Sequence, residues 1–208
     1  MKRLYVIGDS ISIQYGPYLE RYLAGQMAYA RKAQDETAAL ALDPPQGANG
    51  GDSSMVLAFV RAKAEASGFD ADVVLLNCGL WDLRTDPETG ARQTPMPRYR
   101  ANLESIVEIP QAEGVAVVWV RTTPCDEAVH NKPELGFHRY AADVVAYNEA
   151  AEAVMAAHGV LSIDLHAFTL NLGGDLYCDH VHFNEDVRER QAVYIAGWLA
   201  AWDTAISR

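Results

Sequence analysis

Short apolar runs that alternate with segments of helical character constrain the fold of this chain more than any other feature. The runs cover residues 4–7, 73–78, 115–120 and 160–165, and residues 27–30 are a candidate for a further short strand. The run at 73–78 has no apolar–polar alternation, which favours a strand buried on both faces of a parallel sheet. The alternation of strands and helices predicts a three-layer α/β/α sandwich with a parallel sheet of about five strands.

The segments between the runs carry helix signals. We expect helices within residues 14–23, 55–64, 99–112, 139–158 and 184–204. Two segments are less regular. Residues 38–42 fit either a helical turn or a strand, whereas three glycines within residues 46–51 indicate a loop. The connection from residue 122 to residue 138 is longer than usual, which is typical of functional segments such as lids.

The length of 208 residues favours one domain spanning residues 1–208. The net charge of −11, from 17 basic and 28 acidic residues, disfavours nucleic acid and anionic membranes as partners. No apolar run reaches the eighteen or so residues of a transmembrane helix.

The first residues lack the long apolar region of a signal peptide. The three cysteines, Cys78, Cys125 and Cys178, are odd in number and far apart, so they suggest neither a disulfide framework nor a CxxC motif. A cytoplasmic protein is therefore expected.

The turn Gly8-Asp9-Ser10 joins the first predicted strand to the first helix. A serine here lies at the carboxyl edge of the sheet and at a helix N-terminus, where α/β folds bind ligands and backbone N–H groups attract negative charge. Ser10 is therefore a candidate nucleophile. The alternative is that Ser10 only caps the helix, because serine is a preferred N-cap residue.

Three more turns, at residues 50–52, 79–82 and 179–182, follow a strand or precede a helix. Acyl transfer needs a nucleophile, a base, a group that orients the base, and donors for an oxyanion. Ser10 fits the nucleophile, His182 the base, and Asp179, three residues earlier, the orienting carboxylate. The N–H groups of Ser10 and Gly51 are the predicted oxyanion donors.

These turns resemble the sequence blocks of the SGNH (GDSL) hydrolases, a family of esterases and acylhydrolases. Gly8-Asp9-Ser10 matches the first block, Gly51-Asp52-Ser53 the second, and the Asp-x-x-His of residues 179–182 the last. The resemblance covers nearly the whole chain. It implies a flavodoxin-like SGNH fold, Ser10 as nucleophile, and a substrate among short-chain esters, lipids, thioesters and acetylated sugars. Because the chain is short and has no obvious lipid-binding domain, we expect a small soluble ester, such as an O-acetylated carbohydrate. No cofactor or metal is implied.

The third block departs from the family pattern. The family has Gly-x-Asn-Asp, in which the asparagine amide is an oxyanion donor, whereas this chain has Trp81 at that position. Trp81 offers one indole N–H, which either replaces the amide or leaves the ring as a pocket wall. Asn49 is another candidate contributor, and Asp9 is grouped with these site residues. Asn77 is expected to point elsewhere because it ends a strand.

Other interpretations remain open at this point. His180 and His182 with Asp179 could bind a metal, although metal sites usually need three or four suitable ligands. The glycines of residues 47–51 lack the lysine of a phosphate-binding loop. The missing asparagine motivates a second functional hypothesis, a weakened or non-catalytic binding protein on the same fold.

Overall fold

The computed structural model describes residues 1–32, 42 and 47–206. Its strands are β1 (Lys2–Ile7), β2 (Met27–Arg31), β3 (Val73–Leu76), β4 (Ala116–Val120) and β5 (Leu161–Ile163). Its helices are α1 (Ser10–Leu23), α2 (Ser53–Ala66), α3 (Met96–Ala112), α4 (Glu127–His130), α5 (Ala141–Ala157), α6 (Leu165–Leu172) and α7 (Glu185–Ile206), with a 3-10 turn η1 (Pro133–Leu135). Most of segment 38–42, with its open helix-or-strand prediction, lies outside the described residues.

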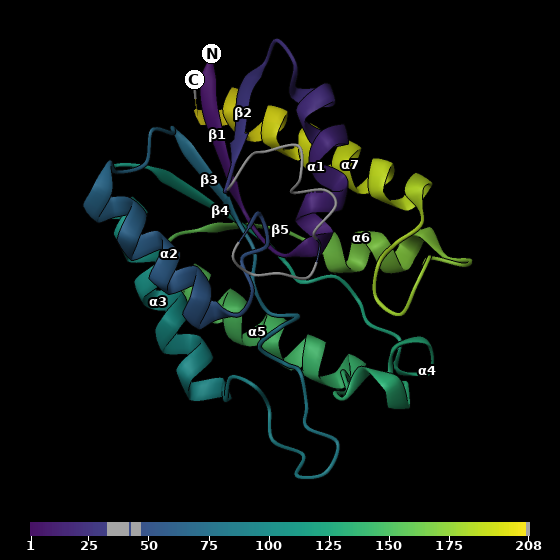
Figure 1. The fold of residues 1–208 in the computed structure, drawn as a ribbon. Helices are drawn as coiled ribbons and strands as arrows, with labels where there is room; N and C mark the ends of the chain where they lie inside the picture. Colours follow the sequence, from purple (N-terminus) through teal and green to yellow (C-terminus); the bar gives the residue numbers. More distant parts are fainter. Residues whose placement is uncertain (33–41, 43–46, 207–208) are drawn as a thin grey trace.

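The five strands form one parallel sheet in the order β2-β1-β3-β4-β5. Helices α1, α6 and α7 cover one face of the sheet, and α2, α3 and α5 cover the other (Figure 1). The prediction of a three-layer α/β/α sandwich is therefore confirmed, and the candidate strand at residues 27–30 is β2.

Both faces of the sheet are buried, as the unbroken apolar runs predict. Along β3, Val73 and Leu75 pack into the core beneath α1 and α7, whereas Val74 and Leu76 pack into the core beneath α2 and α3. Alternate side chains of a strand point to opposite faces, so a strand in the middle layer must be apolar at every position.

Two connections contain helices that the apolar pattern does not reveal. The run at residues 160–165 is divided between β5 and α6, because the Asp164 carboxylate accepts a hydrogen bond from the Ala167 N–H (2.9 Å) and caps α6. The long connection from residue 122 to residue 138 contains α4 and η1.

Parallel pairing places the carboxyl ends of all five strands along one edge of the sheet. The first two motif turns meet there. Gly8 forms a parallel bridge with Asn49, and the Gly50 N–H donates to the Gly8 carbonyl (2.9 Å). The strand order therefore brings together turns that lie about forty residues apart in sequence.

Within the described part of the chain, no helix combines the length and apolar character that a membrane span requires. The three cysteines are free thiols.

Candidate active site

Ser10 is the first residue of α1, immediately after the turn that ends β1. The residue that caps this helix is Asp9, whose Oδ1 accepts the Ile11 N–H at 3.0 Å. Ser10 is 8% exposed, and its Oγ lies 2.9 Å from Nε2 of His182. Because Asp9 does the capping, the Ser10 hydroxyl is available for the hydrogen bond with the imidazole.

The turn before α7 carries His182 and Asp179, as the sequence pattern predicts. His182 Nδ1 lies 2.6 Å from Asp179 Oδ2, so the imidazole is held at both nitrogens. The other carboxylate oxygen, Oδ1, accepts the N–H groups of Val181 (2.8 Å) and His182 (2.7 Å). The turn therefore fixes the carboxylate, and the carboxylate fixes the ring.

Asp179 is ionised throughout the physiological range. Partial burial opposes its ionisation, but the N–H groups of His182 and Val181 and the His182 ring outweigh burial and lower the pKa of Asp179 to about 2. A fixed negative charge at Nδ1 favours the tautomer with the proton on Nδ1. That tautomer leaves Nε2 as an acceptor for the Ser10 hydroxyl.

The second motif turn is held by its own side chains. The Gly51 N–H donates to Asn49 Oδ1 (2.8 Å), and Asn49 Nδ2 donates to the Leu42 carbonyl (2.5 Å). Gly51 has a φ of +70°, which favours glycine. Asn49 is fully buried, and its side chain holds the turn.

The third motif turn follows β3 and packs closely on the end of β4. Gly79 has a φ of +152°, and a Cβ atom there would lie 2.5 Å from Thr122 Oγ1, so only glycine fits. Trp81 is half-buried and lines the pocket beside Ser10. Asp82 is fully buried and accepts both the N–H and the hydroxyl of Ser53, at 3.0 and 2.5 Å, so it braces the third turn against the start of α2.

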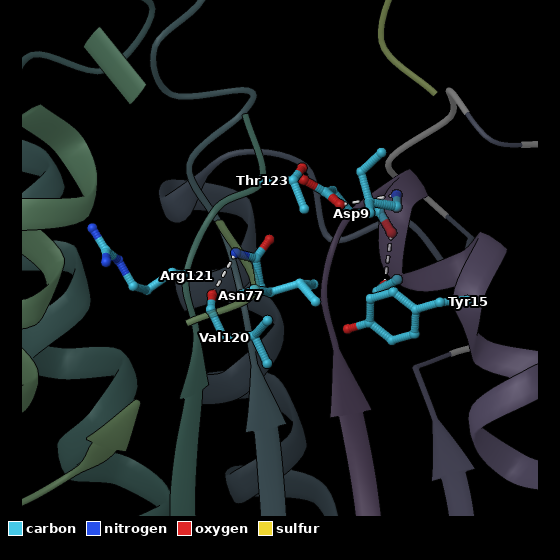
Figure 2. A pocket seen from close by; sticks show the side chains of 9 residues that line it. Asp9, Tyr15, Asn77, Val120, Arg121 and Thr123 are labelled. Atoms are coloured by element: carbon cyan, nitrogen blue, oxygen red, sulfur yellow. Dashed lines mark hydrogen bonds between the residues drawn. The ribbon is translucent and has the colours of Figure 1, made fainter. Parts of the chain in front are cut away.

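Behind the nucleophile lies a small cavity of about 10 Å³, close to the size needed for one water molecule (Figure 2). Asp9 and Thr123 line it together with Tyr15 and Asn77. Burial raises the pKa of Asp9, and the Ile11 N–H and Arg139 partly offset this. The Asn77 amide donates to the Val120 carbonyl (2.8 Å), as the dashed line between these two residues in Figure 2 shows, so Asn77 is directed toward β4.

The Ser10 hydroxyl and the His182 ring open onto a cavity of about 230 Å³. The residues that line it are Ser10, Trp81, Arg84, Leu135, Phe137, Arg139, His180, Val181 and His182. Arg84, Phe137 and Arg139 were not predicted as site residues. The only available signal was the length of the connection from residue 122 to residue 138, since Phe137 lies near its end and Arg139 follows it directly.

His180, which lines this cavity, contacts a second histidine, His130. Nδ1 of His130, on α4, lies 2.9 Å from Nδ1 of His180 and 3.2 Å from the His180 carbonyl oxygen. His130 is fully buried, and burial, with Arg139 and His180 nearby, lowers its pKa to about 4. Among the described residues, no group of three or more His, Cys, Asp or Glu side chains has a metal-binding arrangement.

A side chain from α5 fixes the loop after β4. The Asn148 amide accepts the Thr122 N–H (2.8 Å) and donates to the Thr122 carbonyl (2.9 Å). This pair of hydrogen bonds holds the start of the connection between β4 and α4.

The fold and the motif turns define the class of this protein, a three-layer α/β/α sandwich whose motif turns lie along the carboxyl edge of a parallel sheet. The model of the GDSL-like lipase/acylhydrolase family matches residues 6–190, and the chain belongs to this family. No curated protein matches.

Several solved structures with the same fold are named as esterases or acylhydrolases. A lipase/acylhydrolase from Enterococcus faecalis is 19% identical, with a TM-score of 0.71, over 96% of this chain and 95% of the other. The esterase EstA from Pseudoalteromonas sp. is 14% identical, with a TM-score of 0.67, over 98% of this chain and all of the other. The acetyl xylan esterase AlAXEase is 17% identical, with a TM-score of 0.69, over 95% and 98%.

Proposed function

We propose that this protein hydrolyses carboxylic esters through a covalent acyl-enzyme on Ser10. The observation that carries the proposal is the hydrogen-bonded series Ser10 Oγ–His182 Nε2–His182 Nδ1–Asp179 Oδ2, with separations of 2.9 and 2.6 Å. A hydroxyl, a base and an orienting carboxylate in that sequence are what acyl transfer requires.

In the first half of the reaction, Ser10 Oγ attacks the acyl carbon while its proton moves to Nε2 of His182. The bond between the acyl carbon and the alcohol oxygen then breaks, and the alcohol leaves with the proton from His182. In the second half, water attacks the acyl-enzyme, gives a proton to His182, and releases the acid and the Ser10 hydroxyl. Asp179 stays ionised and stabilises the imidazolium in both halves.

The oxyanion is proposed to bind at the N-terminus of α1, against the Ser10 N–H. The first N–H groups of a helix have no partner within the helix, and the helix dipole favours negative charge there. The Gly51 N–H donates to Asn49 in this structure, so it serves the oxyanion only by sharing or releasing that bond. Trp81, on the same cavity, is the proposed source of a side-chain donor in place of the usual asparagine.

The proposed substrate is a small ester, with an O-acetylated carbohydrate as one candidate. The cavity of about 230 Å³ is small for a ligand site, which favours a short acyl group. The structural similarity to an acetyl xylan esterase supports acetyl esters as the first class to test.

The test is hydrolysis of 4-nitrophenyl acetate by the wild type and by Ser10→Ala. We expect Ser10→Ala to lower kcat by about 10⁴-fold or more, because the covalent route is lost. If the two proteins hydrolyse acetate, butyrate and octanoate esters at the same rate, the esterase proposal is wrong. The non-catalytic binding protein suggested by the missing asparagine would then be favoured. Activity that survives Ser10→Ala but is abolished by a chelator would indicate a metal-dependent hydrolase.

A further inference from the structure

The wall of the cavity beside Ser10 carries two guanidinium groups. Arg84 follows the third motif turn, and Arg139 lies just before α5, so two separate segments bring positive charge to one site. None of the described residues that line this cavity is an aspartate or a glutamate. Arg84 and Arg139 therefore bring two positive charges to the cavity wall of a chain whose net charge is −11.

Aromatic rings hold Arg84 in place. The central guanidinium carbon of Arg84 lies 3.6 Å from the centroid of the Trp81 ring and 4.3 Å from that of Phe137. Stacking of this kind engages the flat face of a guanidinium, whereas its N–H donors lie in the plane of the group. An arginine stacked on rings can therefore still bind an anion at its edge.

Arg139 is nearly fully buried, with 3% of its surface exposed. Its Nε donates to the Leu80 carbonyl (2.6 Å), and its guanidinium carbon lies 5.0 Å from the Phe137 ring centroid. Arg139 therefore also supports the turn that carries Trp81. Its charge, placed in a largely enclosed site, is screened much less by salt than a surface charge.

We propose that this cavity selects esters that carry a carboxylate close to the ester group. Guanidinium groups bind carboxylates through paired hydrogen bonds, and an enclosed positive site raises the local concentration of anions. The small volume of the cavity favours a carboxylate over a larger anionic group. The inference rests on the proposed esterase function, because it names the class of ester that Ser10 would cleave.

The experiment compares matched pairs of esters that differ in one charge. For a carboxylate on the acyl side, the pair is 4-nitrophenyl hydrogen glutarate and 4-nitrophenyl methyl glutarate. For a carboxylate on the alcohol side, the pair is 4-acetoxybenzoate and its methyl ester. The quantity measured is the ratio of kcat/KM for the anionic ester to that for the neutral ester, in the wild type and in each variant.

Three variants isolate the charge of Arg84. Arg84→Met keeps a long apolar side chain for the contacts with Trp81 and Phe137 and removes the charge. Arg84→Lys keeps the charge. Arg190→Met removes an exposed arginine on α7, which pairs with Asp186 and does not line this cavity.

We expect the anionic-to-neutral ratio of at least one pair to fall about tenfold or more in Arg84→Met, mainly through a higher KM for the anionic ester. Arg84→Lys should recover part of the ratio, and Arg190→Met should leave it unchanged. The wild-type ratio should fall only slightly as salt is added, because charges in a largely enclosed site are weakly screened.

Two outcomes overturn the inference and leave the esterase function intact. One is that Arg84→Met lowers kcat/KM equally for anionic and neutral esters, which would mean that Arg84 only supports the pocket. The other is that no ratio changes although 4-nitrophenyl acetate is hydrolysed in a Ser10-dependent way. If the wild type hydrolyses none of the esters, the proposed function fails and the inference falls with it.

Discussion

At the scale of single residues, the site depends on how Asp179 is held. Its Oδ1 accepts two backbone N–H groups and its Oδ2 contacts His182, so each oxygen has a separate task. The same hydrogen bonds that close the turn also keep the carboxylate ionised. Local backbone geometry therefore determines the tautomer of the imidazole, which in turn determines whether Ser10 faces an acceptor.

This arrangement predicts that Asp179→Asn lowers kcat by roughly 10²–10⁴-fold with little change in stability. The amide oxygen can still accept the two N–H groups, but the amide nitrogen would face Nδ1 and favour the wrong tautomer of His182. The measurements are kcat with 4-nitrophenyl acetate and the free energy of unfolding from a urea unfolding curve.

The matched control is Asp175→Asn, an exposed aspartate near the same turn, which should have nearly wild-type kcat. A kcat for Asp179→Asn within a factor of three of the wild type would remove Asp179 from the proposed mechanism.

At the scale of elements, Asp82 joins two motif turns. It belongs to the turn after β3, and its carboxylate accepts the N–H and hydroxyl of Ser53, the first residue of α2. Burial raises the pKa of Asp82 to about 7, although the hydrogen bonds from Ser53 lower it. The start of α2 and the third turn are therefore fixed relative to each other by one buried group.

We expect Asp82→Ala to lower the free energy of unfolding by about 2–4 kcal/mol at pH 8, because it leaves the buried Ser53 donors without their acceptor. The comparison is Asp70→Ala, which removes an exposed ion pair with Arg3 and should cost about 1 kcal/mol or less. Urea unfolding measures both variants. Equal costs for the two substitutions would show that Asp82 is not a structural link.

At the scale of the whole molecule, burial of His130 ties folding to pH. Its pKa is lowered to about 4 in the folded state, chiefly by burial, and is about 6.5 in an unfolded chain. Between these values the unfolded state binds the proton first, so stability falls as pH decreases from about 6.5 to about 4. Above pH 6.5 this contribution to stability is fully present.

We expect the melting temperature of His130→Gln to fall less than that of the wild type when the pH is lowered from 6.5 to 4.5. The variant must be compared with the wild type, because Asp82 affects the pH dependence of stability as well. Its raised pKa makes the folded state more stable as the pH falls over part of this range, which opposes the effect of His130. His158→Gln, at the end of α5, serves as the control and should follow the wild-type curve. Parallel curves for His130→Gln and the wild type would contradict the prediction.

The sequence alone determined the layers of the fold and the positions of the motif turns. Apolar runs without alternation can only be buried on both faces, and helical segments between them leave little choice but a parallel sheet. The short-range pairing of Asp179 with His182 also follows from a spacing of three residues. These features are local or periodic, so they can be read from the order of residues.

Tertiary structure decided what no local pattern encodes. The approach of Ser10 to His182, 172 residues apart, depends on the order of the strands and on the packing of α7 against α1. The position of Arg84 and Arg139 on one wall of the cavity likewise arises from contacts between separate segments. The sequence pattern around a polar or charged residue does not indicate which distant residue it will contact. Only the packing of the folded chain brings such partners together.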